Sequence, residues 1–226
     1  IVVRLVGSEM CIRDSDYDEA KRRDRPIQRA PSEALKAINV EASDVTDVII
    51  THLHYDHAGG LNDFPNAKFH LQETEMAYAT GPCMCHETIK MPFTGEHVCE
   101  MVKNLYSGRV VFYNGIGSIK GGVTVHLIGG HSRGLQSVRV KTENGYLCLA
   151  SDATHFYENF LMGKPFPIVV DLEDMLNGFK LIKSLATSND MVIPGHDPLV
   201  KNFFPKEGTS GFVWRLDKGP TSPVKI

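Results

Sequence analysis

Residues 51–60 read THLHYDHAGG, and the rest of the chain is organised around them. Within six positions they carry four side chains of types that bind transition metals: His52, His54, Asp56 and His57. The β-branched run 45–50 directly before them is typical of a buried strand. Because His52 and His54 are two positions apart, an extended or tightly turned backbone can aim both imidazoles at one point. The stretch therefore predicts metal ligands at the carboxyl end of a strand, with the chain turning into a helix near Asp56.

Three further candidate ligands follow short apolar runs elsewhere in the chain. His131 lies in GGHS after the run 123–128, Asp152 lies in SDA after 146–150, and His196 lies in PGHD after 191–193. The ends of strands are where α/β architectures place reactive groups. Singly, each residue could instead be a capping or core polar residue. Together with the first cluster they make a set of five histidines and two aspartates.

The series HxHxDH, glycine-flanked His, SDA and PGHD resembles the metallo-β-lactamase fold superfamily. More narrowly, the segments HLHYDHAGG, FHLQETEMAYATG and GGHSRGLQS resemble the N-acyl-homoserine lactonase branch of quorum-quenching enzymes. The resemblance covers roughly residues 30–205. It implies an α/β fold of the four-layer αββα sandwich type, built from two similar halves and here short of some N-terminal strands.

The resemblance also implies how the ligands divide between two divalent metal ions. His52, His54 and His131 would hold one ion, and Asp56, His57 and His196 the second, with Asp152 bridging both. A donor set of imidazole and carboxylate without thiolate suits zinc, with iron, manganese or cobalt as alternatives. None of the cysteines stands at a ligand position, which favours a two-metal hydrolase over a β-lactamase proper.

The activity that this family implies is the opening of lactone rings by attack of a metal-bound hydroxide. Two neighbouring divalent ions lower the pKa of a shared water to about 7 and stabilise the oxyanion. We expect Asp56 to assist proton transfer. His155 occupies a place where many quorum-quenching lactonases have a tyrosine that contacts the lactone carbonyl, so His155, or Tyr157 nearby, would have to take this role. Alternatively, His155 is a supporting or surface residue.

Three other functions remain open from the sequence. A thioesterase of the glyoxalase II kind or another ester hydrolase would use the same metal site. A basic pocket for glutathione carboxylates would favour the thioesterase, yet only Arg133 and Arg139 are basic near the motifs. The chain could also be a truncated domain that binds metal without turnover.

Composition narrows the possible partners. The 226 residues suit one domain with a sizeable core, and the net charge of -3 gives no basic footprint for nucleic acid. No apolar run approaches the roughly 20 residues that span a bilayer. The five cysteines are an odd number without the usual zinc spacing, which favours reduced thiols and a cytoplasmic protein. We therefore expect a small-molecule ester or lactone as the substrate, and the oligomeric state stays open.

The chain divides into a leader and one domain. Residues 1–15 differ in character from the rest and are predicted to be non-native, with a real edge strand at 1–6 as the alternative. The domain then covers 16–226, beginning with a charged linker at 16–29. Strands are expected at 45–51, 67–71, 109–113, 123–128, 136–142, 146–150 and 191–193, and another edge strand around 212–214. Helices are expected at 31–38, 73–78, 96–106 and 171–186.

Several residues outside the motifs have weaker assignments. The irregular segment 81–108 should shape the substrate pocket, and four of its residues are either acyl-chain contacts or core: Met84, Met91, Phe93 and Met101. Asp197 should orient His196 or cap the next helix. Four other histidines lack the post-strand glycine context and are expected to be structural or exposed: His70, His86, His97 and His126.

Overall fold

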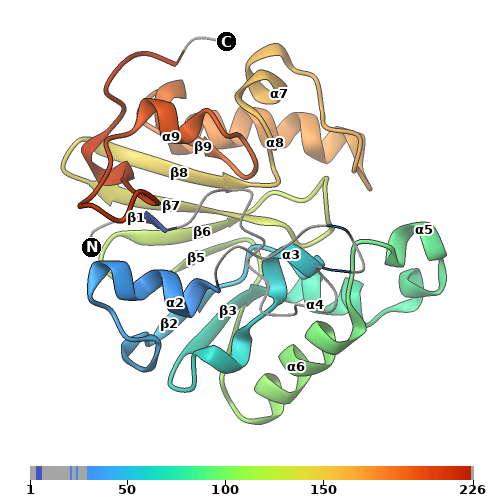
Figure 1. Ribbon diagram of the computed structural model, residues 1–226. Coiled ribbons are helices and arrows are strands. Elements are labelled where there is room, and N and C mark those ends of the chain that lie inside the picture. The colour runs from blue at the N-terminus through green and yellow to red at the C-terminus, as the bar shows by residue number, and fades with distance from the viewer. Residues whose placement is uncertain (1–3, 7–20, 22–23, 25–29, 225–226) are drawn as a thin grey trace. The chain divides into compact units, whose positions relative to one another are not determined.

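The computed structural model describes residues 4–6, 21, 24 and 30–224 (Figure 1). Most of the predicted leader and of the charged linker lies outside the described residues. The chain divides into two compact units, and each is described by itself below. The N-terminal unit lies within Cys11–Tyr113, and the C-terminal unit comprises Asn114–Ile226 together with the first strand.

The N-terminal unit is built on a three-stranded parallel sheet in the order β2-β3-β4. Its strands are β2 (Asp47–Ile49), β3 (Lys68–Gln72) and β4 (Val110–Tyr113). The helices are α2 (Pro31–Leu35), α3 (Tyr55–Ala58), α4 (Glu73–Ala79), α5 (Glu87–Lys90) and α6 (Gly95–Tyr106).

The core of this unit covers β3 on both faces, although its sequence KFHLQ alternates between polar and apolar residues. Phe69 and Leu71 on β3 are fully buried, and Leu53 and Met101 belong to the same apolar cluster. Parallel strands are commonly buried on both faces, and the polar side chains of His70 and Gln72 on β3 are buried as well. Leu53 lies between the first two histidines of the motif, so the motif loop is anchored in the core of this unit.

The C-terminal unit holds a five-stranded sheet in the order β5-β6-β7-β8-β9, antiparallel except for the parallel pair β8 and β9. The strands are β5 (Ile116–Ser118), β6 (Val123–Leu127), β7 (Gln136–Thr142), β8 (Gly145–Ser151) and β9 (Val192–Pro194). A separate pair joins β1 (Arg4–Val6) and β10 (Val213–Arg215) antiparallel. The helices are α7 (Tyr157–Met162), α8 (Leu172–Leu185) and α9 (Val200–Phe203).

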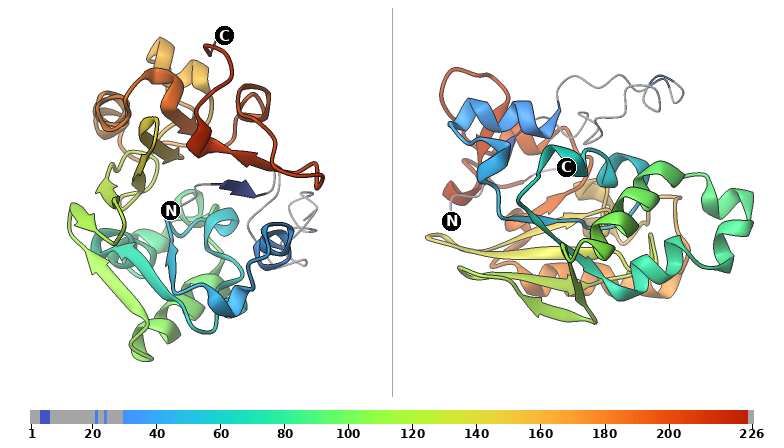
Figure 2. Two further views of the ribbon diagram at one scale, coloured as in Figure 1. Left: turned by 90° about the vertical axis from the view of Figure 1, so that its left-hand side faces the viewer. Right: turned by 90° about the horizontal axis from the view of Figure 1, so that it is seen from below.

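Helix α8 covers one face of the five-stranded sheet (Figures 1 and 2). It begins where the Asp171 side chain accepts a hydrogen bond from the N–H of Asp174, the usual capping arrangement. Met175, Phe179 and Ile182 recur at helical spacing and are buried. A Cβ at Gly178 would lie 2.6 Å from a methyl carbon of Ile128, so the helix needs glycine at this position to approach the end of β6.

The predicted elements are confirmed to within a few residues. The predicted helix at 31–38 is split into α2 and a 3₁₀ turn, Lys36–Ile38, and the Glu143-Asn144-Gly145 turn joins β7 to β8. Strand β5 and helices α5, α7 and α9 were not predicted, because each is too short to show a hydrophobic period. The β1–β10 pair corresponds to the alternative of a real edge strand, and the non-native origin of residues 1–15 stays a prediction.

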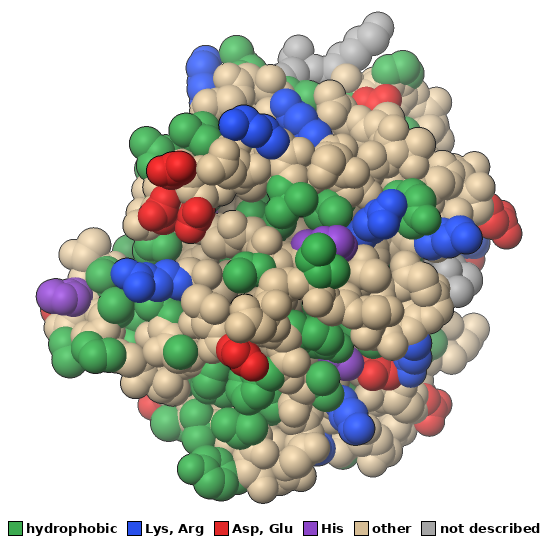
Figure 3. Space-filling model, turned by 180° about the vertical axis from the view of Figure 1, so that it is seen from behind, with side chains coloured by type: hydrophobic (Ala, Val, Ile, Leu, Met, Phe, Trp, Pro, Cys, Tyr) green, Lys and Arg blue, Asp and Glu red, His purple; other side chains and the backbone are tan. Residues whose placement is uncertain are grey.

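The distribution of charge on the surface and the character of the helices agree with the balanced charge and the short apolar runs of the sequence. On the face that Figure 3 presents, basic and acidic side chains are interspersed rather than gathered by sign. Within the described part of the chain, no helix combines the length and the apolar character needed to cross a membrane.

Candidate metal centre

The N-terminal ligand set (His52, His54, Asp56 and His57) occupies the loop after β2 and the first turn of α3, as predicted. The ring centroids of His52 and His57 are 4.2 Å apart, and those of His52 and His54 are 4.5 Å apart. His57 Nε2 lies 3.7 Å from a carboxylate oxygen of Asp56. Because α3 begins at Tyr55, its first turn returns His57 toward His52. This set therefore gathers three imidazoles and one carboxylate in one small region.

Backbone contacts hold this loop in shape. The N–H of Leu53 donates to Glu75 Oε1 of α4 at 2.8 Å, and the N–H of Tyr55 donates to the carbonyl of Pro92 at 2.8 Å. His54 forms an isolated β-bridge with Phe93 and packs edge-on against its ring, with centroids 4.7 Å apart. Segment 81–108 thus supports the motif through residues 92 and 93, and Phe93 itself is buried.

The C-terminal ligand set (His131, Asp152 and His196) is centred on the Asp152 carboxylate, which the predicted catalytic residue His155 also faces. The Nε2 atoms of His131, His155 and His196 lie 3.2, 3.3 and 3.1 Å from its oxygens. The ligand atoms of His131, Asp152 and His155 lie within 4.8 Å of one another, close enough to share a metal ion. A carboxylate that faces several imidazoles on both of its oxygens is suited to bridging cations.

His131 is oriented by two features of the chain around it. Gly129 and Gly130 both have positive φ, and a Cβ at Gly130 would lie 2.6 Å from the backbone nitrogen of Met175. The Nδ1 of His131 lies 2.9 Å from the carbonyl oxygen of Ile168, which can only accept, so Nδ1 carries the proton. The lone pair is then on Nε2, the atom that faces Asp152, and this is the tautomer a metal ligand requires.

Asp152 occupies a strained turn after β8. The pairing of β8 with β9 shifts register between Leu149 and Ser151, and Ser151 has a φ of 49°, in the left-handed region. A Cβ at Gly195 would lie 2.7 Å from Asp152 Oδ1 and 2.9 Å from backbone atoms of Ser151. The PGHD motif therefore needs glycine before His196 so that the Asp152 carboxylate can keep its position.

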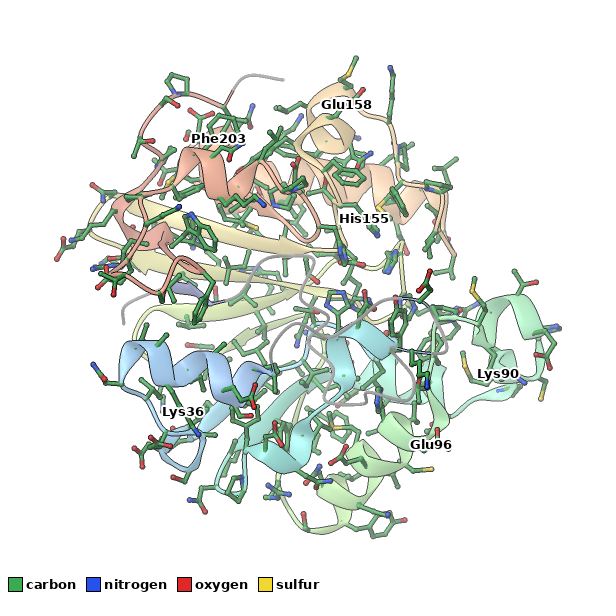
Figure 4. The ribbon with its side chains drawn as sticks, in the orientation of Figure 1. Lys36, Lys90, Glu96, His155, Glu158 and Phe203 are labelled. Atoms are coloured by element: carbon green, nitrogen blue, oxygen red, sulfur yellow. The ribbon has the colours of Figure 1, made fainter. Side chains whose placement is uncertain are left out.

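His155 lies beside this set and is buried, so it is not a surface residue. Its ring stacks on Phe166 with centroids 4.0 Å apart and on His196 at 5.0 Å (Figure 4 labels its position). Its Nδ1 is buried and has no hydrogen-bond partner among the described residues. Burial lowers the pKa of His155 below its ordinary value, although the Asp152 carboxylate opposes this shift. His155 is therefore a neutral imidazole at pH 7. Tyr157, the other candidate for this role, is fully buried at the start of α7.

Asp197 caps α7, which precedes it in the chain, and not the next helix as predicted. One carboxylate oxygen accepts from the N–H of Tyr157 at the start of α7, and the other accepts from the N–H of Leu199. The N–H of His196 donates to the carbonyl of His155 at 3.0 Å. These bonds join the loops that carry two of the histidines.

The donor chemistry of both ligand sets fits divalent metal ions. Imidazole nitrogens and carboxylate oxygens without thiolate are typical of open catalytic sites rather than of closed structural ones. Cys148 on β8 is fully buried, and burial raises the pKa of its thiol to about 12, which keeps it protonated. The four described cysteines are free thiols, in agreement with the sequence prediction.

The remaining histidines are structural or exposed, as predicted. Both ring nitrogens of His70 are occupied, Nε2 by Asp47 at 2.9 Å and Nδ1 by the hydroxyl of Tyr113 at 2.8 Å. His126 bonds to the Thr124 hydroxyl, His97 is buried, and His86 is exposed. The contact with Asp47 and Tyr113 thus gives His70 a structural role.

Sequence reasoning missed two supporting residues, Glu75 and Phe166. Glu75 is a charged residue in an amphipathic helix, where the sequence gives no sign that it is fully buried. Phe166 lies in an aperiodic segment rich in proline. Only the fold brings these side chains to Leu53 and His155.

Comparison with known proteins agrees with this geometry. Residues 16–196 match the metallo-beta-lactamase superfamily. The chain belongs to this superfamily, which confirms the predicted α/β fold class.

Within the superfamily, the chain is similar to N-acyl homoserine lactonases. It is 31% identical over 165 residues to N-acyl homoserine lactonase AiiA of Bacillus thuringiensis subsp. kurstaki, which covers 72% of this chain and 60% of that protein. It is 29% identical over 172 residues to N-acyl homoserine lactonase AttM of Agrobacterium fabrum, which covers 73% and 62%. The chain thus spans about three fifths of the length of these relatives.

Solved structures show the same likeness. An N-acyl homoserine lactone hydrolase with the product N-hexanoyl-L-homoserine at its catalytic metal centre superimposes with a TM-score of 0.65 and 26% identity, covering 79% of this chain and 66% of that chain. The dizinc quorum-quenching lactonase AidC, at 16% identity and a TM-score of 0.63, covers 99% and 92% and shows the fold alone.

Proposed function

We propose that this protein is a dinuclear metal-dependent hydrolase that opens the ring of N-acyl homoserine lactones. The observation that carries the proposal is the Asp152 carboxylate with three imidazole Nε2 atoms within 3.3 Å. The N-terminal ligand set adds three imidazoles and a carboxylate of the same chemistry. In this proposal the two sets together hold a pair of divalent ions, zinc first, with Asp152 as the bridging ligand.

Bound metal would supply Lewis acidity and lower the pKa of water to about 7, which provides a nucleophile at neutral pH. The protein residues then orient the reaction and move protons. The carbonyl of Ile168 fixes the tautomer of His131 with the lone pair on Nε2, as a metal ligand requires. Asp56 accepts and returns the proton that ring opening requires.

His155 is the residue that we assign to contact the substrate carbonyl, and its lowered pKa supports this assignment. As a neutral imidazole it carries one N–H. Its Nδ1 has no partner among the described residues, and the proposed role requires the tautomer with the proton on Nδ1 rather than on Nε2, which faces Asp152 at 3.3 Å. A donor placed where negative charge develops stabilises the transition state. We assign His155 this role, in place of the tyrosine that many quorum-quenching lactonases use.

The similarity to N-acyl homoserine lactonases supports the substrate assignment. A small-molecule substrate is also consistent with the interspersed charges on the face that Figure 3 presents. The free cysteines favour a reducing compartment, so we place the enzyme in the cytoplasm.

The proposal is tested by measuring metal content and hydrolysis on one preparation of the chain. We expect about two metal ions per chain, and lactone opening faster than cleavage of S-lactoylglutathione, a cephalosporin or aryl esters. His52→Ala should abolish turnover because it removes a ligand, whereas His155→Gln should lower kcat by about 10²-fold or less. Exposed His86 provides the matched control, and His86→Gln should behave as wild type.

Each other result assigns a different function. Preferential thioester cleavage would make the protein a thioesterase of the glyoxalase II kind. Two bound metals without turnover on any of these substrates would leave a metal-binding domain. Absence of bound metal would overturn the proposal altogether.

A further inference from the structure

We propose that Glu75 is a positioning residue of the metal centre, which fixes the angle between His52 and His54 through the peptide between them. This inference rests on the proposed function, because it concerns the metal pair of that same site. The observation that supports the inference is the hydrogen bond of 2.8 Å from the N–H of Leu53 to Glu75 Oε1. Leu53 is the residue between the two histidines, so any shift of its peptide turns both imidazoles.

The burial of Glu75 argues for a dedicated role. The residue is 0% exposed and belongs to α4, whose other buried residues include Met76, Tyr78 and Ala79. A buried carboxylate is costly unless donors or positive charges face it. The Leu53 N–H supplies a donor, and a carboxylate makes this bond shorter and stronger than a neutral acceptor would.

The negative charge of Glu75 also lies near the predicted metal ligands. The carboxylate contacts the backbone at Leu53, one residue from each of two ligands. The negative charge therefore lies close to where the cations of the proposed centre would bind, and in a buried environment such a charge is weakly screened. Glu75 thus supports metal binding in two ways: it positions the histidines, and it offsets part of the positive charge.

Three variants separate these contributions. Glu75→Leu removes both acceptor and charge, Glu75→Gln keeps an acceptor oxygen of the same shape, and Glu73→Gln removes an equal charge from an exposed position two residues earlier on the same helix. The chains are loaded with cobalt(II), whose visible spectrum reports ligand geometry. Metal affinity is measured by competition with a chromophoric chelator, and folding by circular dichroism.

We expect Glu75→Leu to weaken metal binding about 10- to 100-fold, the usual effect of losing a residue that orients a ligand. Its cobalt spectrum should also change in band position. Glu75→Gln should recover most of the affinity and the wild-type spectrum, and Glu73→Gln should match wild type in both. If Glu75→Leu does not fold, Glu75→Gln decides: a wild-type spectrum with an affinity reduced by up to tenfold supports the role.

Two results would overturn the inference while leaving the proposed function intact: wild-type affinity and spectrum in folded Glu75→Leu, or an equal loss in Glu73→Gln. If wild-type protein binds no cobalt, the proposed function fails instead, and the two failures are thereby distinguished.

Discussion

Two residues next to the ligands show how closely the site depends on side-chain size. Gly195 leaves room for the Asp152 carboxylate, since a Cβ there would lie 2.7 Å from its Oδ1. Gly130 allows the loop before His131 to lie against the backbone of Met175 in α8. In both cases glycine is required by a close approach, and at Gly130 also by a positive φ of 80°.

We predict that Gly195→Ala displaces Asp152 and weakens metal binding about 10- to 100-fold, because backbone atoms of Ser151 also block the new methyl group. Metal content after dialysis against a weak chelator checks this. Gly95→Ala is the control, because a Cβ at Gly95 meets nothing within 4 Å. Full metal retention in Gly195→Ala would contradict the prediction.

His126 gives a prediction for pH dependence. Burial and the nearby Arg139 charge lower its pKa below the ordinary 6.5, so the folded state favours the neutral ring. Protons then bind the unfolded chain more readily, and the contribution of His126 is lost as pH falls below about 6.5 toward its folded pKa. The loss cannot exceed about 1.4 kcal/mol for each pH unit.

This prediction is checked by urea unfolding of the metal-free protein at pH 7.5 and 5.5. The free energy of unfolding should fall less in His126→Gln than in wild type over this interval. His86→Gln, which changes an exposed histidine, should follow wild type. An equal fall in His126→Gln and wild type would show that His126 does not contribute.

At the scale of elements, the segment between α7 and α8 acts as a support for the C-terminal ligand set. Its Phe166 ring stacks on His155, and its Ile168 carbonyl accepts from His131. The N–H groups of Val170 and Asp171 both donate to the carbonyl of Gly130, which fixes the segment to the loop before His131. This segment has no regular secondary structure, so its contacts alone keep it in place.

We predict that Phe166→Ala lowers kcat about three- to tenfold with little change in melting temperature. The Phe166 ring is partly exposed and its main contact is His155, so its removal frees that imidazole more than it weakens the core. Steady-state kinetics and thermal unfolding provide the measurements. Ile168→Ala is the matched control, because the Ile168 side chain is 39% exposed and only its carbonyl contacts His131. An unchanged kcat in Phe166→Ala would contradict the prediction.

At the scale of the whole molecule, each of the two compact units carries one set of predicted ligands. Each set follows the carboxyl end of a strand: the N-terminal set follows β2, whereas Asp152 and His196 follow the parallel neighbours β8 and β9. Parallel pairing brings the carboxyl ends of β8 and β9 to the same edge of the sheet. Beyond the strands, the N–H of Gly195 donates to the carbonyl of Thr154 and so continues the pairing of the two segments.

We predict that metal stabilises the whole chain. Free metal at about 100 times its dissociation constant should add about 2.7 kcal/mol, or roughly 5–10 °C in melting temperature for a chain of this size. A chelator should reverse the gain. If the two sets hold the same metal pair, His52→Ala and His131→Ala should each lose most of the gain, and the double variant should lose little more. Additive losses would point to separate sites.

The elements that the sequence predicted well are those with a strong local pattern. The apolar run 123–128, the Glu143-Asn144-Gly145 turn and the period of α8 all lead to the observed elements. The short elements β5 and α7 carry no such pattern, because one turn of helix or three strand residues cannot establish a period. Helix α7 begins where Asp197 accepts a hydrogen bond from its first N–H. Because Asp197 lies 40 positions later in the chain, the sequence around α7 cannot predict this contact.

The sequence itself determined the chemistry of the predicted ligands. Residue type decides which side chains can bind a metal, and the local pattern predicts the strands that they follow. The supports of the ligands were decided by tertiary structure. Glu75 on the Leu53 peptide, Phe166 on the His155 ring and the Ile168 carbonyl on His131 join residues 11 to 37 positions apart. The physical reason is that a side chain's character is local, whereas its orientation depends on the groups that folding packs around it.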